Sequence, residues 1–390
     1  MIKYLSVENF SSIKDEIIFE ADIGCKRQLD TNKAFVVFGS NASGKTNFLK
    51  AITFLFWFMK RSFFALKPHQ QIPVDTFVTQ EDKSTKFYVE FIIKDNLYKY
   101  TLELNKHKVL YEKLEKNRFR KPIYERNKDN IYARGLSKNI LKDLPPNVSI
   151  ISFLSRFETQ IFAREIQLYN VVSNVTYAGL SDEDRREVDV AKEIIDLKIK
   201  DKALQILNIA DTGIVDFSLS ADGNVKESII EQLQNDSSIK LLLSKINLNQ
   251  LFFTHIINGE RVEFDFSQES EGTKKLFLKL KDIIEIVDKG GIFIFDEIDS
   301  RLHFKIVEYI VSLFRSSLNA QLICSSHSPN IIDSSFDAKT LWFTQKENGV
   351  TSLYSAYDFE DLKKDMSLQK LYEIGRFGAV PKTFYPDNKE

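Results

Sequence analysis

The sequence predicts an α/β protein that combines a sheet of buried strands with an antiparallel β lobe and a helical insertion. Continuous apolar runs at residues 34–38, 291–295 and 321–325 predict the buried strands. Residues 86–114 alternate between apolar and polar side chains, which is typical of antiparallel strands with one exposed face. Residues 150–250 have a mainly helical pattern. Together these three observations define the fold class.

The composition excludes several classes of protein. The chain has 390 residues, enough for two or three structural units, and 43% of them are hydrophobic, which excludes a disordered protein. Because 54 basic residues balance 55 acidic ones, any contact with nucleic acid or lipid must be local. Cys25 and Cys324 are the only cysteines, which argues against a disulfide framework and suits a reducing cytoplasm.

The sequence also argues against export and membrane insertion. The first residues include Glu8 and lack the continuous apolar region of a signal peptide. The densest apolar stretch, residues 51–59, is far shorter than the roughly 20 residues that span a bilayer. We therefore expect a cytoplasmic protein with no membrane partner.

The N-terminal part predicts strand, turn, strand, and then a strand that leads into a helix. Strands are expected at residues 2–7 and 16–21, and a buried strand at 34–38 ends at Gly39. From Gly44 to about Phe64 the apolar residues recur at helical spacing. A helix is therefore expected to start directly from a glycine-containing loop.

Further along the chain, a second β signal precedes the two later buried strands. Two alternating segments flank Asn258-Gly259, which predicts a hairpin with a two-residue turn. A helix is expected from about residue 273 to 287. The proposed organisation has four segments: an N-terminal part of an α/β head (1–68), an antiparallel β lobe with a basic segment (69–138), a mainly helical insertion (139–250) and the C-terminal part of the head (251–390).

Residues 39–46 match the phosphate-binding pattern G-x-x-x-x-G-K-[ST] in full. Backbone N–H groups of such a loop and the positive end of the following helix bind phosphate oxygens. Lys45 is expected to reach the β and γ phosphates of ATP, and the Thr46 hydroxyl to ligate Mg²⁺. The flanking strand and helix disfavour a chance glycine turn. The expected nucleotide-binding residues are Gly39, Ser40, Asn41, Ala42, Ser43, Gly44, Lys45, Thr46 and Asn47.

The buried strand at 291–295 ends in two carboxylates, Asp296 and Glu297. Asp296 is placed to hold Mg²⁺, and Glu297 is placed to polarise the water that attacks the γ-phosphate. The alternative is an acidic pair that stabilises a helix N-terminus. The phosphate-binding loop in the same chain makes the catalytic interpretation the better one.

Lys45 and Asp296 lie 251 positions apart, which is far more than one βαβ crossover needs. This spacing resembles the ABC class of ATPases, in the soluble branch with SMC-like, RecF-like and OLD-like proteins. The resemblance implies a P-loop ATPase head split by an insertion. It also implies a signature at Ser270–Lys274, in which Ser270 and Gly272 contact the nucleotide of a second protomer. This signature has one glycine fewer than the commonest form.

The same resemblance assigns a switch histidine and leaves another position open. His327 follows the strand at 321–325 and is expected to sense the γ-phosphate. Asp299 matches the D-loop position, although a solvated surface aspartate is nearly as good an interpretation. Three glutamines fall in the region of the Q-loop, and the sequence does not decide among them: Gln70, Gln71 and Gln80.

Several further segments resemble the AAA-type ATP-binding proteins of bacterial anti-phage and abortive-infection operons, the group of the RloA and AbiL ATPases. They are Glu8–Phe10, Asp296–His303, the SSHSP segment starting at Ser325, and Leu371–Pro381. Many relatives carry Arg after Asn9-Phe10, where this chain has Ser11. The resemblance implies Mg²⁺-dependent ATP hydrolysis by a homodimer or higher homo-oligomer. It also implies a separate toxic effector, such as a nuclease, encoded in the same operon.

Two other functions stay open at this point: a RecF-like DNA-repair ATPase, and a nucleotide-gated scaffold with negligible turnover. Residues 106–138 carry eleven basic and four acidic residues, a net charge of +7, with interleaved aromatic side chains. Such a segment either contacts DNA or forms a solvated or partner-binding face. The insertion at about 140–250 contains no His or Cys, so we expect a recognition arm and not a metal site.

Overall fold

The computed structural model describes residues 1–128, 130–157, 159–175, 186–221, 249–363 and 366–380. Contacts divide the chain into two compact units. The first unit comprises Met1–Asp182, Ile286–Ser300 and Val307–Glu390, and the second comprises Glu183–Glu285 and Arg301–Ile306. In the described residues the chain passes between the units within α9 (Glu271–Lys289), between Ser300 and Arg301, and within α10 (Phe304–Ser316). The finer division into four segments stays a prediction.

A six-stranded sheet forms the centre of the first unit, in the order β16-β15-β3-β14-β13-β9. Its neighbours from β15 to β9 pair in parallel, and β16 pairs antiparallel with β15. The strands are β3 (Ala34–Phe38), β9 (Val171–Ser173), β13 (Gly291–Phe295), β14 (Ala320–Ser325), β15 (Leu341–Glu347) and β16 (Val350–Ser355). The predicted mixed α/β class is confirmed.

The three predicted buried strands are neighbours in this sheet. Every residue of β3, β13 and β14 is buried, as expected for apolar runs covered on both faces. Because they run in parallel, their C-terminal ends meet at one edge of the sheet. The segments that follow Phe38, Phe295 and Ser325 are therefore brought together there.

The antiparallel lobe is a seven-stranded sheet in the order β2-β1-β4-β5-β6-β7-β8. Its strands are β1 (Ile2–Glu8), β2 (Ile17–Glu20), β4 (Thr85–Ile93), β5 (Asn96–Leu104), β6 (Val109–Lys116), β7 (Tyr124–Asn127) and β8 (Asn130–Ala133). The first two strands belong to this sheet because β1 pairs with β4 along its length. The lobe therefore includes residues far upstream of residue 69.

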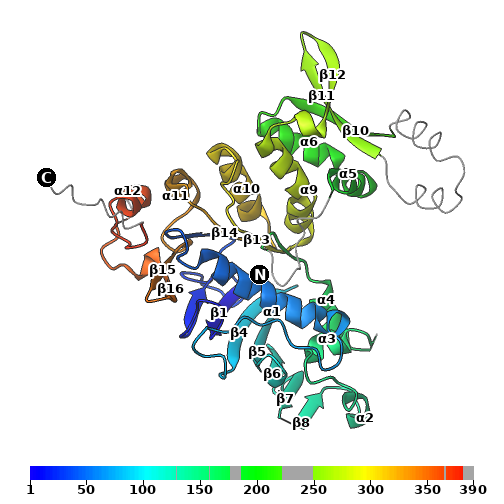
Figure 1. Cartoon of the computed structure of the whole chain (residues 1–390), viewed down its shortest axis with the longest axis vertical. Coiled ribbons are helices and arrows are strands. Elements are labelled where there is room, and N and C mark those ends of the chain that lie inside the picture. Colours follow the sequence, from blue (N-terminus) through cyan, green and yellow to red (C-terminus); the bar gives the residue numbers. More distant parts are fainter. Residues whose placement is uncertain (129, 158, 176–185, 222–248, 364–365, 381–390) are drawn as a thin grey trace, which may run out of the picture. The chain divides into compact units, whose positions relative to one another are not determined.

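Helix α1 (Lys45–Ala65) packs between the two sheets (Figure 1). On one side Phe54 contacts Phe87 of β4, with ring centroids 5.6 Å apart. On the other side the helix contacts β13 and β14. Because both faces are covered, apolar residues occur all around this helix and not along a single stripe.

Shorter helices complete the first unit. They are α2 (Lys138–Leu141), α3 (Ile150–Leu154), α4 (Ile161–Leu168), α11 (Ile332–Ser335) and α12 (Leu368–Glu373). The segment after α12 packs against the central sheet: the Phe377 ring stacks on Phe343 of β15 at 4.6 Å, and the Tyr354 hydroxyl donates to the Phe377 carbonyl at 2.6 Å. In its described part, the Leu371–Pro381 motif therefore contributes to the core; Pro381 lies outside the described residues.

The second unit contains helices and a three-stranded antiparallel sheet in the order β10-β11-β12. Its described elements include α5 (Glu187–Asp196), α6 (Lys200–Ile209), β10 (Ile214–Ala221), β11 (Asn249–Ile257), β12 (Glu260–Asp265) and most of α9. The predicted hairpin is confirmed, with φ of 53° at Asn258 and 85° at Gly259. Two strands that the sequence analysis did not predict, β9 and β10, also lie among the described residues between 139 and 250.

No helix in the part of the chain that the structure describes is long and apolar enough to cross a membrane.

Candidate nucleotide-binding site

The loop between β3 and α1 is shaped by two glycines that have no room for a side chain. A Cβ at Gly39 would lie 2.4 Å from Ser43 Oγ, and one at Gly44 would lie 2.3 Å from Thr351 Oγ1. Gly44 also has φ of 109°, which L side chains rarely adopt, and Ala42 has φ of 61°. The sequence pattern therefore marks two real steric constraints.

Lys45, the first residue of α1, is folded back onto this loop. Its Nζ donates to the carbonyl oxygen of Gly39 at 2.8 Å and to that of Ser40 at 3.0 Å. Burial lowers the pKa of Lys45, while the carboxylates of Asp296, Glu297 and Asp299 act in the opposite direction. The ammonium group is thus held at the loop and within the electrostatic reach of the three acidic residues.

Thr46 and Asp296 are in direct contact. Thr46 Oγ1 donates to Asp296 Oδ2 at 2.7 Å, and the Ser325 hydroxyl donates to Asp296 Oδ1. The residue after Lys45, the end of β13 and the end of β14 therefore share one carboxylate. A hydroxyl and a carboxylate are the oxygen donors that Mg²⁺ prefers, so this pair fits the predicted metal site.

Glu297, Asp299 and His327 form a second group beside this pair. The Glu297 backbone has φ of 51° and its N–H donates to Ser325 Oγ at 2.8 Å, and its side chain is 58% exposed. His327 Nε2 lies 3.9 Å from Glu297 Oε1, and the His327 backbone N–H donates to Asp299 Oδ2 at 3.1 Å. The structure thus brings the expected D-loop residue, Asp299, into contact with the expected switch residue, His327.

Asn174 is a site residue that the sequence analysis missed. It follows β9, and its side chain brackets the Asp296 backbone: the Asp296 N–H donates to Asn174 Oδ1 at 2.6 Å, and Asn174 Nδ2 donates to the Asp296 carbonyl at 3.0 Å. Of the glutamines considered for the Q-loop, Gln70 accepts a hydrogen bond at its side chain from the Lys67 N–H at 3.0 Å. Because β9 has only three residues, the sequence shows no periodic pattern that would predict a strand ending just before Asn174.

A network of hydroxyl groups supports the loop from behind. Thr351 Oγ1 donates to the Ser43 carbonyl at 3.1 Å and pairs with Ser12 Oγ at 2.8 Å. The amide of Asn47 donates to the same Ser12 oxygen at 2.7 Å. Asn47 therefore connects α1 to the N-terminal strands in addition to its predicted place in the loop motif.

Ser270 and Gly272 belong to the second unit, which is described by itself. The Ser270 hydroxyl caps α9 by accepting from the Thr273 N–H at 3.1 Å. A Cβ at Gly272 would lie 2.4 Å from the Arg301 carbonyl oxygen, and the Arg301 guanidinium forms an ion pair with Glu271. These contacts hold the predicted signature segment at the start of a helix.

Comparison with protein families now identifies the class. The chain matches, over residues 34–333, the family described as "AAA domain, putative AbiEii toxin, Type IV TA system". This match spans more than half of the chain, so the chain belongs to that family of AAA domains. The family match indicates an AAA-type ATPase domain. A search of curated proteins finds no match.

The chain is also similar to SMC head domains of known structure. An SMC head bound to the C-terminal winged-helix domain of ScpA has 13% identity and a TM-score of 0.45, with coverage of 95% of this chain and 99% of that chain. The SMC head of Thermotoga maritima gives the same identity and TM-score, covering 91% and 98%. An SMC head derived from Pyrococcus furiosus gives 13% and 0.43, covering 96% and 98%.

Proposed function

We propose that this chain binds and hydrolyses ATP as an ABC-class switch. The hydrogen bond of 2.7 Å between Thr46 Oγ1 and Asp296 Oδ2 carries this proposal. It joins the residue that follows the loop lysine to the carboxylate at the end of β13. Two oxygen ligands at this separation can bind one small cation, and Mg²⁺ in such sites takes its remaining ligands from water and from the phosphates of the nucleotide.

The other residues then have distinct roles. Mg²⁺, when bound, neutralises charge on the phosphate oxygens. Lys45 binds the β and γ phosphates. To do so, its ammonium group gives up its hydrogen bonds to the carbonyls of Gly39 and Ser40. Glu297 is the general base, because its backbone is fixed by Ser325 while its carboxylate is exposed to water. His327, whose Nε2 lies 3.9 Å from Glu297 Oε1, would sense the γ-phosphate.

Calorimetric titration with ATP and Mg²⁺ tests the binding site. Lys45→Ala is expected to abolish measurable binding, because the variant loses the charge that faces the phosphates. Lys50→Ala is a matched control, since Lys50 lies on the same helix one and a half turns further along and is only partly buried. Equal ATP affinity of the Lys45→Ala variant and the wild-type chain would contradict the assignment of the loop.

We further propose that the complete site needs two copies of the chain. Ser270 caps the N-terminus of α9, and the free N–H groups of a helix N-terminus bind anions well. In the ABC class this segment closes over the nucleotide of the partner protomer, so ATP is expected to hold a symmetric homodimer together. Mixed dimers of a Lys45→Ala chain and a Ser270→Arg chain should recover one intact site. No recovery in covalently forced heterodimers would count against assembly in trans.

The biological role that we propose is control of a separate toxic effector in bacterial anti-phage defence, in the cytoplasm. Support comes from the family description, which refers to a toxin and a type IV toxin–antitoxin system. The Lys45→Ala variant should abolish protection of bacteria that carry the complete operon, and pull-down from the native operon should recover the effector. A rate of ATP turnover that rises strongly with DNA alone would instead favour a repair ATPase.

A further inference from the structure

His255 and Glu269 form a side-chain pair in the second unit that has no part in the site proposed above. His255 Nε2 lies 2.6 Å from Glu269 Oε1, and the two side chains are only 18% and 9% exposed. Glu269 directly precedes Ser270, the residue that caps α9. The pair therefore connects a strand of the three-stranded sheet to the start of the predicted signature.

The imidazole of His255 is held in place by the sheet around it. His255 lies in β11, which pairs with β10 on one side and with β12 on the other (Figure 1). The Phe264 ring of β12 meets the imidazole edge-on, with ring centroids 5.1 Å apart. Gly213 leaves room for the ring, since a Cβ there would lie 3.3 Å from His255 Nδ1. A side chain that is packed in this way can fix the position of its hydrogen-bond partner.

The segment between β12 and α9 depends on such contacts for its position. A short helical turn, Phe266–Gln268, leads from β12 to Glu269. Two side chains of this segment contact β11: the Phe266 ring lies 6.0 Å from the Phe253 ring, and Glu269 bonds to His255. The hydrogen bond is the directional contact of the two, and it acts one residue before Ser270.

The chemistry of the pair determines which atom donates. An ionised carboxylate only accepts hydrogen bonds, so the imidazole carries a hydrogen at Nε2 and donates it to Glu269. A hydrogen bond to a charged group in a mostly buried place is stronger than one between neutral groups. Its loss is expected to change a rate that depends on it by about tenfold or more.

We propose that His255 is a positioning residue for ATP hydrolysis in the partner protomer. This inference rests on the proposed function, in which the start of α9 closes over the nucleotide of a second copy of the chain. His255 holds Glu269, and Glu269 fixes the backbone that enters α9. Ser270 is thereby presented in the orientation that the phosphate requires. His255 acts through Glu269 and not on the nucleotide itself.

The test places one substitution on either side of a single composite site in covalently forced heterodimers. One chain carries Ser270→Arg and supplies the nucleotide-binding loop, and the other carries Lys45→Ala and supplies the signature. His255→Ala in the chain that supplies the signature should lower the rate of ATP hydrolysis about tenfold. The same substitution in the chain with Ser270→Arg should not change the rate, because the signature of that chain is already inactive. A purely structural role would lower the rate equally in both arrangements.

Two further variants of the chain that supplies the signature test the hydrogen bond itself. His255→Gln should recover most of the reference rate, because the glutamine amide can also donate to Glu269. In a Glu269→Ala background, His255→Ala should slow hydrolysis no further, because the hydrogen bond is already lost.

The outcomes separate this inference from the proposed function. Equal loss of rate in the two arrangements, or no loss in either, would overturn the inference alone, as would a His255→Gln variant that is no faster than His255→Ala. The reference heterodimer has His255 in both chains. If it hydrolyses no ATP, assembly in trans is contradicted, and this inference is overturned with it.

Discussion

Replacing Gly44 with alanine is expected to destabilise the first unit by about 2–6 kcal/mol. Two effects contribute. At φ of 109° an L residue is strained, which costs roughly 1–3 kcal/mol. In addition, the new Cβ would lie 2.3 Å from Oγ1 and 2.5 Å from Cγ2 of Thr351. Overpacking of this kind costs roughly another 1–3 kcal/mol.

The contact with Thr351 can be separated from the backbone strain. Gly135 also has a positive φ, of 76°, but a Cβ there would meet nothing within 4 Å. Gly135→Ala should therefore show the cost of the backbone alone. In a Thr351→Ala background the two closest atoms are removed while the Thr351 Cβ stays 2.9 Å from the new Cβ, so Gly44→Ala should cost less than it does in the wild-type chain, by part of the roughly 1–3 kcal/mol of overpacking.

Denaturant unfolding followed by tryptophan fluorescence measures these changes. The only tryptophans of the chain, Trp57 and Trp342, lie in α1 and β15, so both report on the first unit. The steric account would be refuted if Gly44→Ala cost no more than Gly135→Ala, or if the effects of Gly44→Ala and Thr351→Ala were simply additive.

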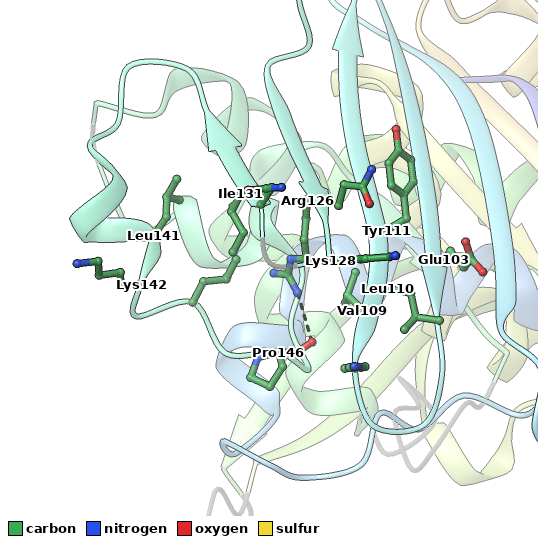
Figure 2. A pocket seen from close by; sticks show the side chains of 14 residues that line it. Glu103, Val109, Leu110, Tyr111, Arg126, Lys128, Ile131, Leu141, Lys142 and Pro146 are labelled. Atoms are coloured by element: carbon green, nitrogen blue, oxygen red, sulfur yellow. Dashed lines mark hydrogen bonds between the residues drawn. The ribbon is translucent and has the colours of Figure 1, made fainter.

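Three further predictions concern other parts of the first unit. Glu112→Ala should lower the free energy of unfolding by about 3–5 kcal/mol, because it removes the carboxylate 3.9 Å from buried Arg126 (Figure 2) and the acceptor of three buried hydrogen bonds, from the Tyr100 and Ser149 hydroxyls and the Ile150 N–H. Glu115→Ala, which breaks only a partly exposed ion pair on the same strand, should cost less than about 1 kcal/mol. Burial lowers the pKa of Lys60 to about 8. Between about pH 8 and pH 10.5 the unfolded chain binds the Lys60 proton more tightly than the folded chain does. The free energy of unfolding of the wild-type chain, relative to that of Lys60→Met, should therefore rise across this interval and stay constant below it. A difference that does not change with pH in denaturant titrations would contradict the assigned burial. Asn174→Ala should reduce Mg²⁺-dependent ATP hydrolysis by about tenfold, because Asp296 loses two hydrogen bonds that fix its backbone; unchanged hydrolysis would assign Asn174 a purely structural role.

Local sequence patterns were enough to predict the strands and helix that carry the candidate site. β3 and β13 have the predicted bounds, since buried strands are uniformly apolar and a glycine or a carboxylate follows directly. The order of the strands could not be predicted in this way. Pairing of β14 between β3 and β13 is set by tertiary packing, and this pairing brings Ser325 to Asp296.

The residues that were missed depend on contacts between distant segments. Asn174 is recognisable only once β9 is seen beside β13, and Thr351 only once β16 is placed behind the loop. The strand β10 is different, because Val215–Ala221 alternates strictly between apolar and polar side chains. That signal was present, although the helical pattern of the neighbouring segments hid it.

The rate of ATP hydrolysis by the Glu297→Gln variant tests the central claim most directly. Glutamine keeps the shape of the side chain but cannot accept the proton from the attacking water. We predict that this variant binds ATP and Mg²⁺ as the wild-type chain does, and that it hydrolyses ATP about 100-fold more slowly or worse. Hydrolysis at the wild-type rate would contradict the assignment of Glu297 and, with it, the proposed catalytic site.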